Sequence, residues 1–233
     1  MTKTRAILTD IEGTTTPIAF VKNVLFPYAR ARMHGFVHAH ACVPPVRAAL
    51  EDVAATTGAS VDRLDTLCDT LVQWIDEDRK ATALKLLQGL IWDAGYAEGT
   101  LRAPVYPDAV HSLRAWRQAG LQLYVYSSGS VHAQKLLFQY SDHGNLLALF
   151  SGHFDTTSGG KREAAAYAHI ADSIARPAAE ILFLSDISAE LDAAAAAGMR
   201  TTWLLRPEDS SATPNERAAS AHPIATSFAS ISL

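Results

Sequence analysis

Short apolar runs alternate along this chain with stretches of helical periodicity. Four runs have the length and composition of buried strands, and a fifth is weaker. The four are Arg5 to Thr9, Leu121 to Tyr126, Ile181 to Leu184 and Thr201 to Leu205, and the weaker one is Leu149 to Phe154. Because strands that alternate with helices form parallel sheets, the pattern predicts an α/β fold with a Rossmann-like, doubly wound parallel sheet.

Three stretches between these strands have the marks of helices. Pro107 to Ala119 has proline at its start and Gly120 directly after it. Ala164 to Ile174 places apolar residues at positions i, i+3, i+4 and i+7, and Ala189 to Ala197 is rich in alanine and stops at Gly198. Each stretch is long enough to cross from one parallel strand to the next.

The region from about Val21 to Ala103 interrupts this alternation, because it contains no convincing strand. Val61 to Ile75 and Leu84 to Ala94 each follow a helical period. We therefore assign residues 1–16 and 104–233 to an α/β core domain and residues 17–103 to an inserted, all-helical cap. The stretch from Arg206 to Pro223 is rich in Ser, Ala, Pro and charge, which predicts a surface loop.

Composition narrows the classes of protein. The 233 residues are 48% hydrophobic and 19% charged, which favours a packed core over disorder. The formal charge of −4 argues against a nucleic-acid partner, and no apolar run reaches the roughly 20 residues that a membrane span needs. With no oligomerisation signal, we expect a monomer that acts on a small molecule.

The cysteines and histidines give no motif of their own. Cys42 and Cys68 do not form a metal-type pair, which favours a reduced, cytoplasmic protein. No HExxH pair occurs among the nine histidines. The group His34, His38 and His40 is interpreted as surface residues or as residues with satisfied hydrogen bonds.

The informative polar residues are those that follow the predicted strands. Asp10 and Glu12 come after the first strand, Ser127 and Ser128 after the second, and Asp186 after the Ile181 strand. Lys161 follows two glycines just before the Ala164 helix. Open parallel sheets bind ligands at the carboxyl ends of their strands, so these groups should converge on one edge.

This set of groups suits phosphoryl transfer. Carboxylates are the ligands that Mg²⁺ prefers, and an aspartate can attack phosphorus. A second acid two residues away can protonate the leaving oxygen, and hydroxyl and lysine groups can hold the phosphoryl oxygens. Each residue alone has an ordinary explanation, such as a helix cap for Asp10 or a solvated side chain for Lys161. Their occurrence at successive strand ends is what indicates a site.

Several of these residues lie in motifs that resemble those of known enzyme families. Asp10 to Thr14, Ser127, Lys161 and Ser185-Asp186 are similar to the four successive motifs of haloacid-dehalogenase-type phosphatases, although Glu12 stands where that superfamily usually has Asp. Longer strings resemble the enolase-phosphatases of methionine salvage. They are Asp10 to Pro17, Ile18 to Lys22, Leu25 to Pro27, Asp78 to Lys80, Tyr126 to Val131, Gln134 to Phe138 and Gly152 to Thr156.

The resemblance implies a Mg²⁺-dependent enzyme that enolises 2,3-diketo-5-methylthiopentyl-1-phosphate and then removes its phosphate. It implies metal-site roles for Asp10, Glu12 and Asp186, with Asp10 and Glu12 also catalytic. It implies substrate or phosphate contacts for Ser127, Ser128 and Lys161.

Several points stay open at this stage. The sequence does not decide whether Glu190 or Asp192 joins the metal site. The enolising base is Glu12, Asp186 or a cap residue, and substrate contacts in the cap are not assigned.

Three other functions are compatible with parts of the pattern. One is a capped phosphatase for another small phosphate, and another is a catalytically silent binding module on the same fold. A dehalogenase is less compatible, because that chemistry has no need of an acidic cluster. For the enzymes, we expect the cap to close on hinges near Thr16-Pro17 and Ala103-Pro104.

Overall fold

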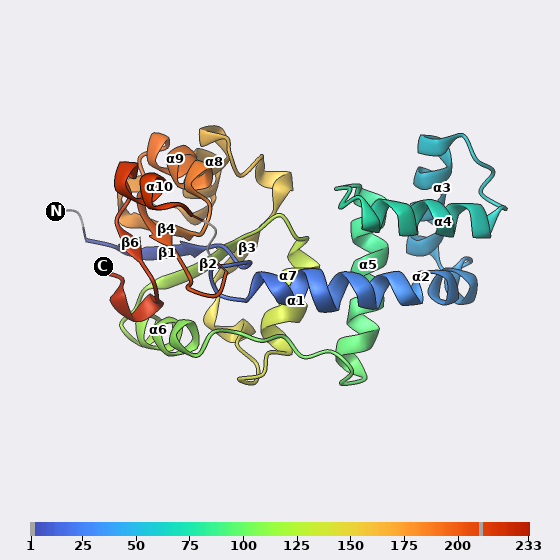
Figure 1. Cartoon of the computed structure of the whole chain (residues 1–233), viewed down its shortest axis with the longest axis horizontal. Helices are drawn as coiled ribbons and strands as arrows, with labels where there is room; N and C mark the ends of the chain where they lie inside the picture. The colour runs from blue at the N-terminus through green and yellow to red at the C-terminus, as the bar shows by residue number, and fades with distance from the viewer. Residues whose placement is uncertain (1–2, 210–211) are drawn as a thin grey trace. The chain divides into compact units, whose positions relative to one another are not determined.

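The computed structural model describes residues 3–209 and 212–233. The chain divides into two compact units (Figure 1). The core unit combines the segment up to Phe20 with Arg102–Leu233, and the helical unit is Val21–Leu101. The sequence places the domain boundaries after residue 16 and before residue 104, whereas the units divide after Phe20 and before Arg102. The functions assigned to the two domains stay predictions.

The core unit is built on a parallel sheet of six strands in the order β3-β2-β1-β4-β5-β6. The strands are β1 (Ala6–Thr9), β2 (Gln122–Tyr126), β3 (Gly152–Phe154), β4 (Ile181–Ser185), β5 (Arg200–Leu204) and β6 (Ile224–Ala225). The predicted doubly wound sheet is therefore confirmed. Only β6 was not predicted, because a strand of two residues leaves no apolar run in the sequence.

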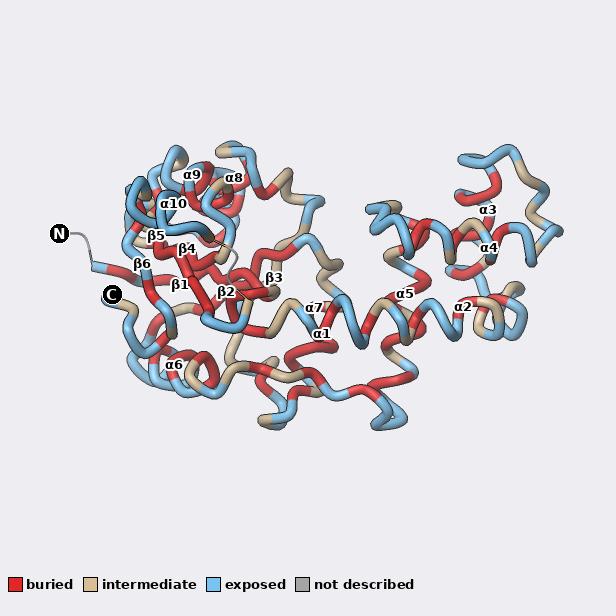
Figure 2. Tube along the Cα trace, viewed as in Figure 1, coloured by how far each residue is buried: buried red, intermediate tan, exposed pale blue. Residues whose placement is uncertain are grey.

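The central position of β1 explains its uninterrupted apolar sequence. Thr9 pairs with Val125 of β2 on one side and with Leu184 of β4 on the other. Every residue of β1 is buried, since helices cover both faces of the sheet. Figure 2 shows the buried stretches concentrated along the strands of this unit.

The helices of the core unit lie on both faces of the sheet. They are α1 (Ile18–Phe20), α6 (Pro107–Gln118), α7 (Val131–Gln139), α8 (Ala164–Ile174), α9 (Ser188–Ala196) and α10 (Pro214–Ala219), with short 3₁₀ turns η2 (Leu147–Leu149), η3 (Thr156–Ser158), η4 (Ala178–Glu180) and η5 (Phe228–Ser230). α8 and α9 cover one face, and α6 and α7 cover the other (Figure 1). The predicted helices at 107–119, 164–174 and 189–197 match α6, α8 and α9 to within a residue or two.

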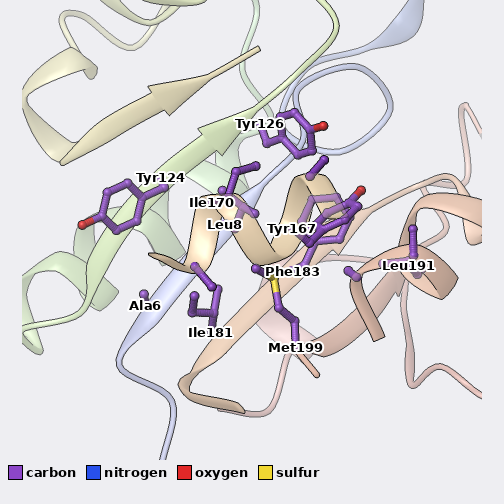
Figure 3. Packing of buried hydrophobic residues seen from close by; sticks show 14 of the residues in the cluster. Ala6, Leu8, Tyr124, Tyr126, Tyr167, Ile170, Ile181, Phe183, Leu191 and Met199 are labelled. Carbon is purple, nitrogen blue, oxygen red and sulfur yellow. The ribbon is translucent and has the colours of Figure 1, made fainter. Parts of the chain in front are cut away.

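The core between the sheet and α8 is aromatic. Tyr167 of α8 packs edge-on against Tyr126 of β2 and against Phe183 of β4, with ring centroids 5.4 and 5.0 Å apart (Figure 3). All three side chains are fully buried. Both tyrosine hydroxyls find backbone partners, as buried hydroxyl groups require.

The helical unit contains no strand anywhere in Val21–Leu101, all of which is described. It consists of a π-helical turn η1 (Val21–Leu25) and the helices α2 (Phe26–His40), α3 (Pro44–Thr57), α4 (Leu64–Asp76) and α5 (Thr82–Ala97). α2 packs against both α4 and α5. Trp92 of α5 is buried, and its indole nitrogen donates a hydrogen bond to the carbonyl of Leu25 at 2.8 Å. The predicted inserted helical domain is confirmed.

The segment predicted as a surface loop after Arg206 is more structured than expected. It contains α10, which begins with a capping box formed by Thr213 and Glu216. Arg206 is itself buried, and its guanidinium group donates to the carbonyl of Thr14 at 2.9 and 3.1 Å and to Asp108 at 2.7 Å. Arg206 therefore ties the end of β5 to the loop after β1.

A second contact from the same segment involves Asp209. One of its carboxylate oxygens accepts hydrogen bonds from the backbone N–H of Ile18 at 3.1 Å and from the hydroxyl of Tyr106 at 2.5 Å.

Among the described helices, none combines the length and apolarity that crossing a bilayer would take.

Candidate active site

The loop after β1 is a tight turn that starts at the carboxyl edge of the sheet. The backbone N–H of Asp10 donates to Leu184 of β4 at 2.9 Å, so Asp10 still lies in the ladder. Beyond it, Gly13 takes a positive φ of 67°, and its N–H donates to the carbonyl of Thr16 at 2.8 Å. The turn folds the chain back and leaves Asp10 buried and Glu12 half-buried at the edge.

Lys161 lies between two carboxylates in this buried region. Its ammonium nitrogen is 2.8 Å from Asp10 Oδ1 and 2.7 Å from Glu190 Oε2. The lysine side chain is only 7% exposed, so the charge is almost completely removed from water. Buried charges persist in proteins only when they are paired and hydrogen-bonded, and here both conditions are met.

Electrostatics keep this lysine charged. Burial alone would lower the pKa of Lys161, but the neighbouring Asp10 and Glu190 more than offset it and raise the pKa above its ordinary value. Burial, with the negative charge of Asp10 second, raises the pKa of Glu190 to about 7. Glu190 also accepts a hydrogen bond from the hydroxyl of Ser185 at 2.9 Å.

Asp186 brings a third carboxyl group to the same edge. It follows β4, the neighbour of β1, and its backbone carbonyl accepts a hydrogen bond from the indole N–H of Trp203 at 2.7 Å. Burial raises its pKa to about 8, with further increases from Asp10 and Glu190. Asp186 and Gly13 also line a cavity of about 290 Å³, so open volume lies beside this carboxyl group.

Gly13 allows the Asp186 carboxyl group to approach the first loop. A Cβ atom on Gly13 would lie 2.5 Å from Asp186 Oδ2 and 2.8 Å from its Cγ. Real Cβ atoms are essentially never found so close to a neighbour. Glycine is thus required here both for its positive φ and for the space that the carboxyl group occupies.

The two serines follow β2, on the other side of β1. Ser127 is buried; its backbone N–H donates to Phe154 at 3.2 Å, and its hydroxyl accepts from Gly129 at 3.3 Å. The amide nitrogen of Gln134 donates to the carbonyls of Gly129 and Phe154, each at 2.8 Å, which fixes the turn. Ser128 is exposed at the tip of this turn.

The backbone around Lys161 is held by two hydroxyl groups from the aromatic core. Tyr126 donates to the carbonyl of Gly159 at 2.9 Å, and Tyr167 donates to the carbonyl of Lys161 itself at 2.8 Å. Gly159 has a φ of 121°, and a Cβ there would lie 2.7 Å from the Cβ of Ala166. Gly159 therefore lets the loop before Lys161 pack directly on α8.

The structure places the sequence candidates at one edge of the sheet and adds one residue. Asp10 and Lys161 are in contact, the charge of Asp10 acts on Asp186, and Glu12 and Ser127 lie just beyond neighbouring strands. Glu190 joins them through Lys161.

Asp192 does not join this cluster, because its exposed carboxylate pairs with His222 at 3.1 Å. The spacing of Glu190 and Asp192 in the sequence could not show which of the two acids joins the cluster. The available signal was that Glu190 lies in the first turn of a helix beginning just after Asp186.

The donor chemistry of the cluster fits a hard divalent cation. Asp10, Glu12 and Asp186 offer only oxygen ligands, which is the set that Mg²⁺ and similar cations take. The raised pKa of Asp186 reports negative charge and burial that a bound cation would compensate. The residues present therefore fit the metal that the sequence motifs imply.

Comparison with known proteins agrees with this chemistry. The family model of haloacid dehalogenase-like hydrolases matches residues 4–198. Enolase-phosphatase E1 of Pseudomonas aeruginosa strain UCBPP-PA14 is 55% identical over 227 residues, covering 97% of each chain. Enolase-phosphatase E1 of Granulibacter bethesdensis is 53% identical over 231 residues, covering 99% of this chain and 96% of its own.

A solved structure is also similar to this chain over nearly its whole length. The UTR4 protein of Saccharomyces cerevisiae superimposes with a TM-score of 0.82 at 34% identity, covering 98% of this chain and 100% of that one. A match of this coverage extends over both units, and the stretch matched by the family model spans every residue of the cluster. The chain belongs to the haloacid dehalogenase-like hydrolases and, within them, to the enolase-phosphatase family.

Proposed function

We propose that this protein carries out two successive reactions on one substrate in methionine salvage. It first enolises 2,3-diketo-5-methylthiopentyl-1-phosphate and then hydrolyses the phosphate, giving the acireductone 1,2-dihydroxy-3-keto-5-methylthiopentene. The observation that carries the proposal is the buried contact of Lys161 with Asp10 and Glu190, beside Asp186. The names of relatives more than 50% identical support the choice of substrate.

Asp10 is the proposed nucleophile. Its carboxylate attacks phosphorus in line with the leaving oxygen, so that the phosphoryl group is transferred to Asp10 as an aspartyl-phosphate. Water then hydrolyses this acyl phosphate and restores the carboxylate. The contact with Lys161 at 2.8 Å holds the Asp10 side chain in one orientation, which keeps the attacking atom in position.

Glu12 is the proposed acid and base of the phosphatase step. It lies two residues beyond Asp10 on the same turn and is half-buried. It donates a proton to the leaving oxygen and later accepts one from the attacking water. In the core unit, Glu12 and Asp186 are also the proposed candidates for the base that removes the carbon-bound proton in the enolisation step.

The remaining groups hold the phosphate. The Lys161 ammonium group and the hydroxyls of Ser127 and Ser128 are the proposed partners of the phosphoryl oxygens. Asp10, Glu12 and Asp186 would hold a Mg²⁺ ion. When bound, that ion supplies charge that offsets the repulsion between a carboxylate and a phosphate and polarises a carbonyl oxygen.

A single assay tests the two-step proposal. The diketone phosphate is mixed with enzyme and Mg²⁺, and the ultraviolet absorbance of the enol is recorded together with the release of inorganic phosphate. We expect the enol signal to appear before phosphate, and we expect EDTA to stop phosphate release until Mg²⁺ is restored. Phosphate release without an enol would instead indicate a phosphatase for another small phosphate, and no release at all would indicate a silent binding module.

The helical unit is proposed to act as the cap. The protein is proposed to work as a monomer, and light scattering coupled to size-exclusion chromatography tests this by measuring its mass in solution.

Phosphate release from p-nitrophenyl phosphate, a small surrogate that needs no enolisation, gives a control for the phosphatase step alone.

A further inference from the structure

Two helices of the helical unit bring together a set of side chains that phosphatase chemistry does not use. His34 and His38 lie on α2, and Cys68 lies on α4. Each of them offers one potential ligand atom, and these three atoms all lie within 4.8 Å of one another. Among the described residues, this is the group of histidine, cysteine and acidic side chains that meets that criterion.

The group forms part of a row of polar contacts between α2 and α4. Arg30 and Asp76 form a two-pronged ion pair at 2.7 and 2.9 Å. One and two helical turns further along α2, His34 lies 3.2 Å from Asp69 and His38 lies 2.8 Å from Asp65. The i, i+4 spacing of the two histidines places both rings on the face of α2 that meets α4.

The interpretation made from the sequence holds for these histidines, because each ring is at least partly exposed and has a hydrogen-bonding or ion-pair partner. His40 was grouped with the other two histidines, but its ring bonds to the carbonyl of Phe36 and stacks on the Phe36 ring instead. Cys68 could not be recognised as a partner from the sequence, since it comes from a helix about 30 residues away along the chain. His40 therefore serves as a matched control for the two rings that face α4.

Cys68 brings a sulfur atom to within 4.8 Å of a ring nitrogen of each histidine. The residue is fully buried, whereas the side chains of His34 and His38 are about half exposed. Asp65 and Asp69 flank it on α4, three residues before and one residue after. Sulfur, imidazole nitrogen and carboxylate oxygen are thus available from two adjacent helices, and one side of the cluster is open to solvent.

These ligand types and distances suit one class of cation. Zinc takes cysteine sulfur at about 2.3 Å and histidine nitrogen at about 2.0–2.1 Å, so ligands of one tetrahedral ion lie about 3.3–3.8 Å apart. Ligand atoms within 4.8 Å reach that separation by small rotations of the exposed histidine side chains. We propose that His34, His38 and Cys68 form a second metal site, which binds Zn²⁺ and links α2 to α4.

The ion would be held by a thiolate and two neutral imidazoles, with Asp65, Asp69 or water as the fourth ligand. On binding, the thiol of Cys68 loses its proton to solvent and the sulfur donates an electron pair to the metal. Carboxylates beside metal-bound imidazoles also fix their orientation. Because sulfur and imidazole select zinc over magnesium, this site is chemically distinct from the all-oxygen cluster of the core unit.

The test uses the full-length protein, freed of metal and then saturated with Mg²⁺ to occupy the oxygen cluster. Co²⁺ serves as a spectroscopic probe, because bonding to a thiolate gives an intense near-ultraviolet band that oxygen ligands do not produce. We expect that band in the wild type at one equivalent of Co²⁺ and its loss when Zn²⁺ is added. We expect no band in Cys68→Ala, and at least a tenfold weaker affinity for Zn²⁺ in His38→Ala.

Matched variants separate the metal site from damage to the fold. Cys42 is exposed and His40 lies outside the cluster, so Cys42→Ala and His40→Ala should bind Co²⁺ as the wild type does. Mg²⁺-dependent phosphate release should survive in all four variants, which keeps this test independent of the proposed function. Absence of the thiolate band in the wild type, its persistence in Cys68→Ala, or equal Zn²⁺ affinities of His38→Ala and His40→Ala would each overturn the proposal.

Discussion

The ammonium group of Lys161 lies out of water with a carboxylate on either side. Asp10 and Glu190 hold it at 2.8 and 2.7 Å, and Asp186 adds a third acidic group nearby. One lysine thus faces three acids, and burial disfavours the ionisation of two of them, Asp186 and Glu190. At this scale each side chain depends on the others, so that removal of one charge changes the environment of all of them.

Replacement of Asp10 by asparagine tests the nucleophile. Asparagine has nearly the same shape, but its amide cannot attack phosphorus, so we expect kcat for phosphate release to fall at least about 10³-fold. Circular dichroism should show an unchanged fold. Asp192→Asn is the matched control, because that exposed carboxylate contacts only His222 in the described structure, and it should retain full activity. Turnover of Asp10→Asn within tenfold of the wild type would refute the assignment.

Glu190→Gln tests the residue that the structure added to the site. Glutamine keeps the hydrogen bond from Ser185 but removes one of the two charges that hold Lys161. We expect the free energy of unfolding to fall by about 1–3 kcal/mol and kcat to fall about 10–100-fold with little change in KM, since a misplaced group weakens the reacting geometry. Chemical denaturation and steady-state kinetics measure both. If the free energy of unfolding and kcat both kept their wild-type values, Glu190 would have no role in holding Lys161.

Among the elements, the turn after β1 determines the shape of the site. Its backbone reverses at Gly13 and is closed by hydrogen bonds back to Ile11. The carboxyl group of Asp186, from the end of β4, fills the space that a side chain at position 13 would need. Two strand ends are therefore fitted to each other through a residue that has no side chain.

Gly13→Ala separates backbone strain from steric conflict. Gly120 provides the control, because its φ of 86° is also positive but a Cβ there would meet nothing within 4 Å. Both substitutions should lower the free energy of unfolding by about 1–2 kcal/mol, the cost of a left-handed conformation for alanine. Only Gly13→Ala should displace Asp186 and reduce kcat. Equal activity of the two variants in the phosphate-release assay would contradict this account.

Elements with strong apolar patterns were predictable, and those without were not. The four strong strands follow from apolar runs because they are mostly buried, and the edge strand β3 has a weaker run because it is only half-buried. β6 is too short to leave a pattern. α10 was missed although Thr213 and Glu216 form a recognisable capping box.

In the site, the strand-end rule located Asp10, Ser127 and Asp186, because it depends only on topology. The choice between Glu190 and Asp192 depended on how α9 is rotated. An alanine-rich helix does not reveal that rotation, since it has no apolar stripe to mark its buried face.

For the molecule as a whole, the buried acids make the free energy of unfolding depend on pH. Burial, together with Asp10 and Glu190, raises the pKa of Asp186 to about 8, and burial with Asp10 raises that of Glu190 to about 7. In the unfolded chain both groups return to ordinary values near 4. The folded, metal-free protein therefore binds more protons than the unfolded chain between these limits.

The folded protein without metal is therefore expected to lose stability as pH rises. Asp186 and Glu190 contribute stability at the acid side of the window, and that contribution is lost as pH rises from about 4 through about 8. We expect Mg²⁺ to raise the melting temperature more at pH 8 than at pH 5.5, because it needs deprotonated ligands. Calorimetry at both pH values, with and without Mg²⁺, measures this. In Asp186→Asn, both the loss of stability with rising pH and the stabilisation by Mg²⁺ should be smaller. If this variant behaved as the wild type does, the role of Asp186 in the pH dependence would be contradicted.

The guanidinium group of Arg206 holds the carbonyl of Thr14, and so it joins two segments that lie 192 residues apart in the sequence. During synthesis, the turn that carries Asp10 and Glu12 is made long before its neighbour β4 and its anchor Arg206. The turn can therefore reach its folded environment only after Arg206 has been translated, so this edge of the sheet is completed late in synthesis although its first carboxylates are made early.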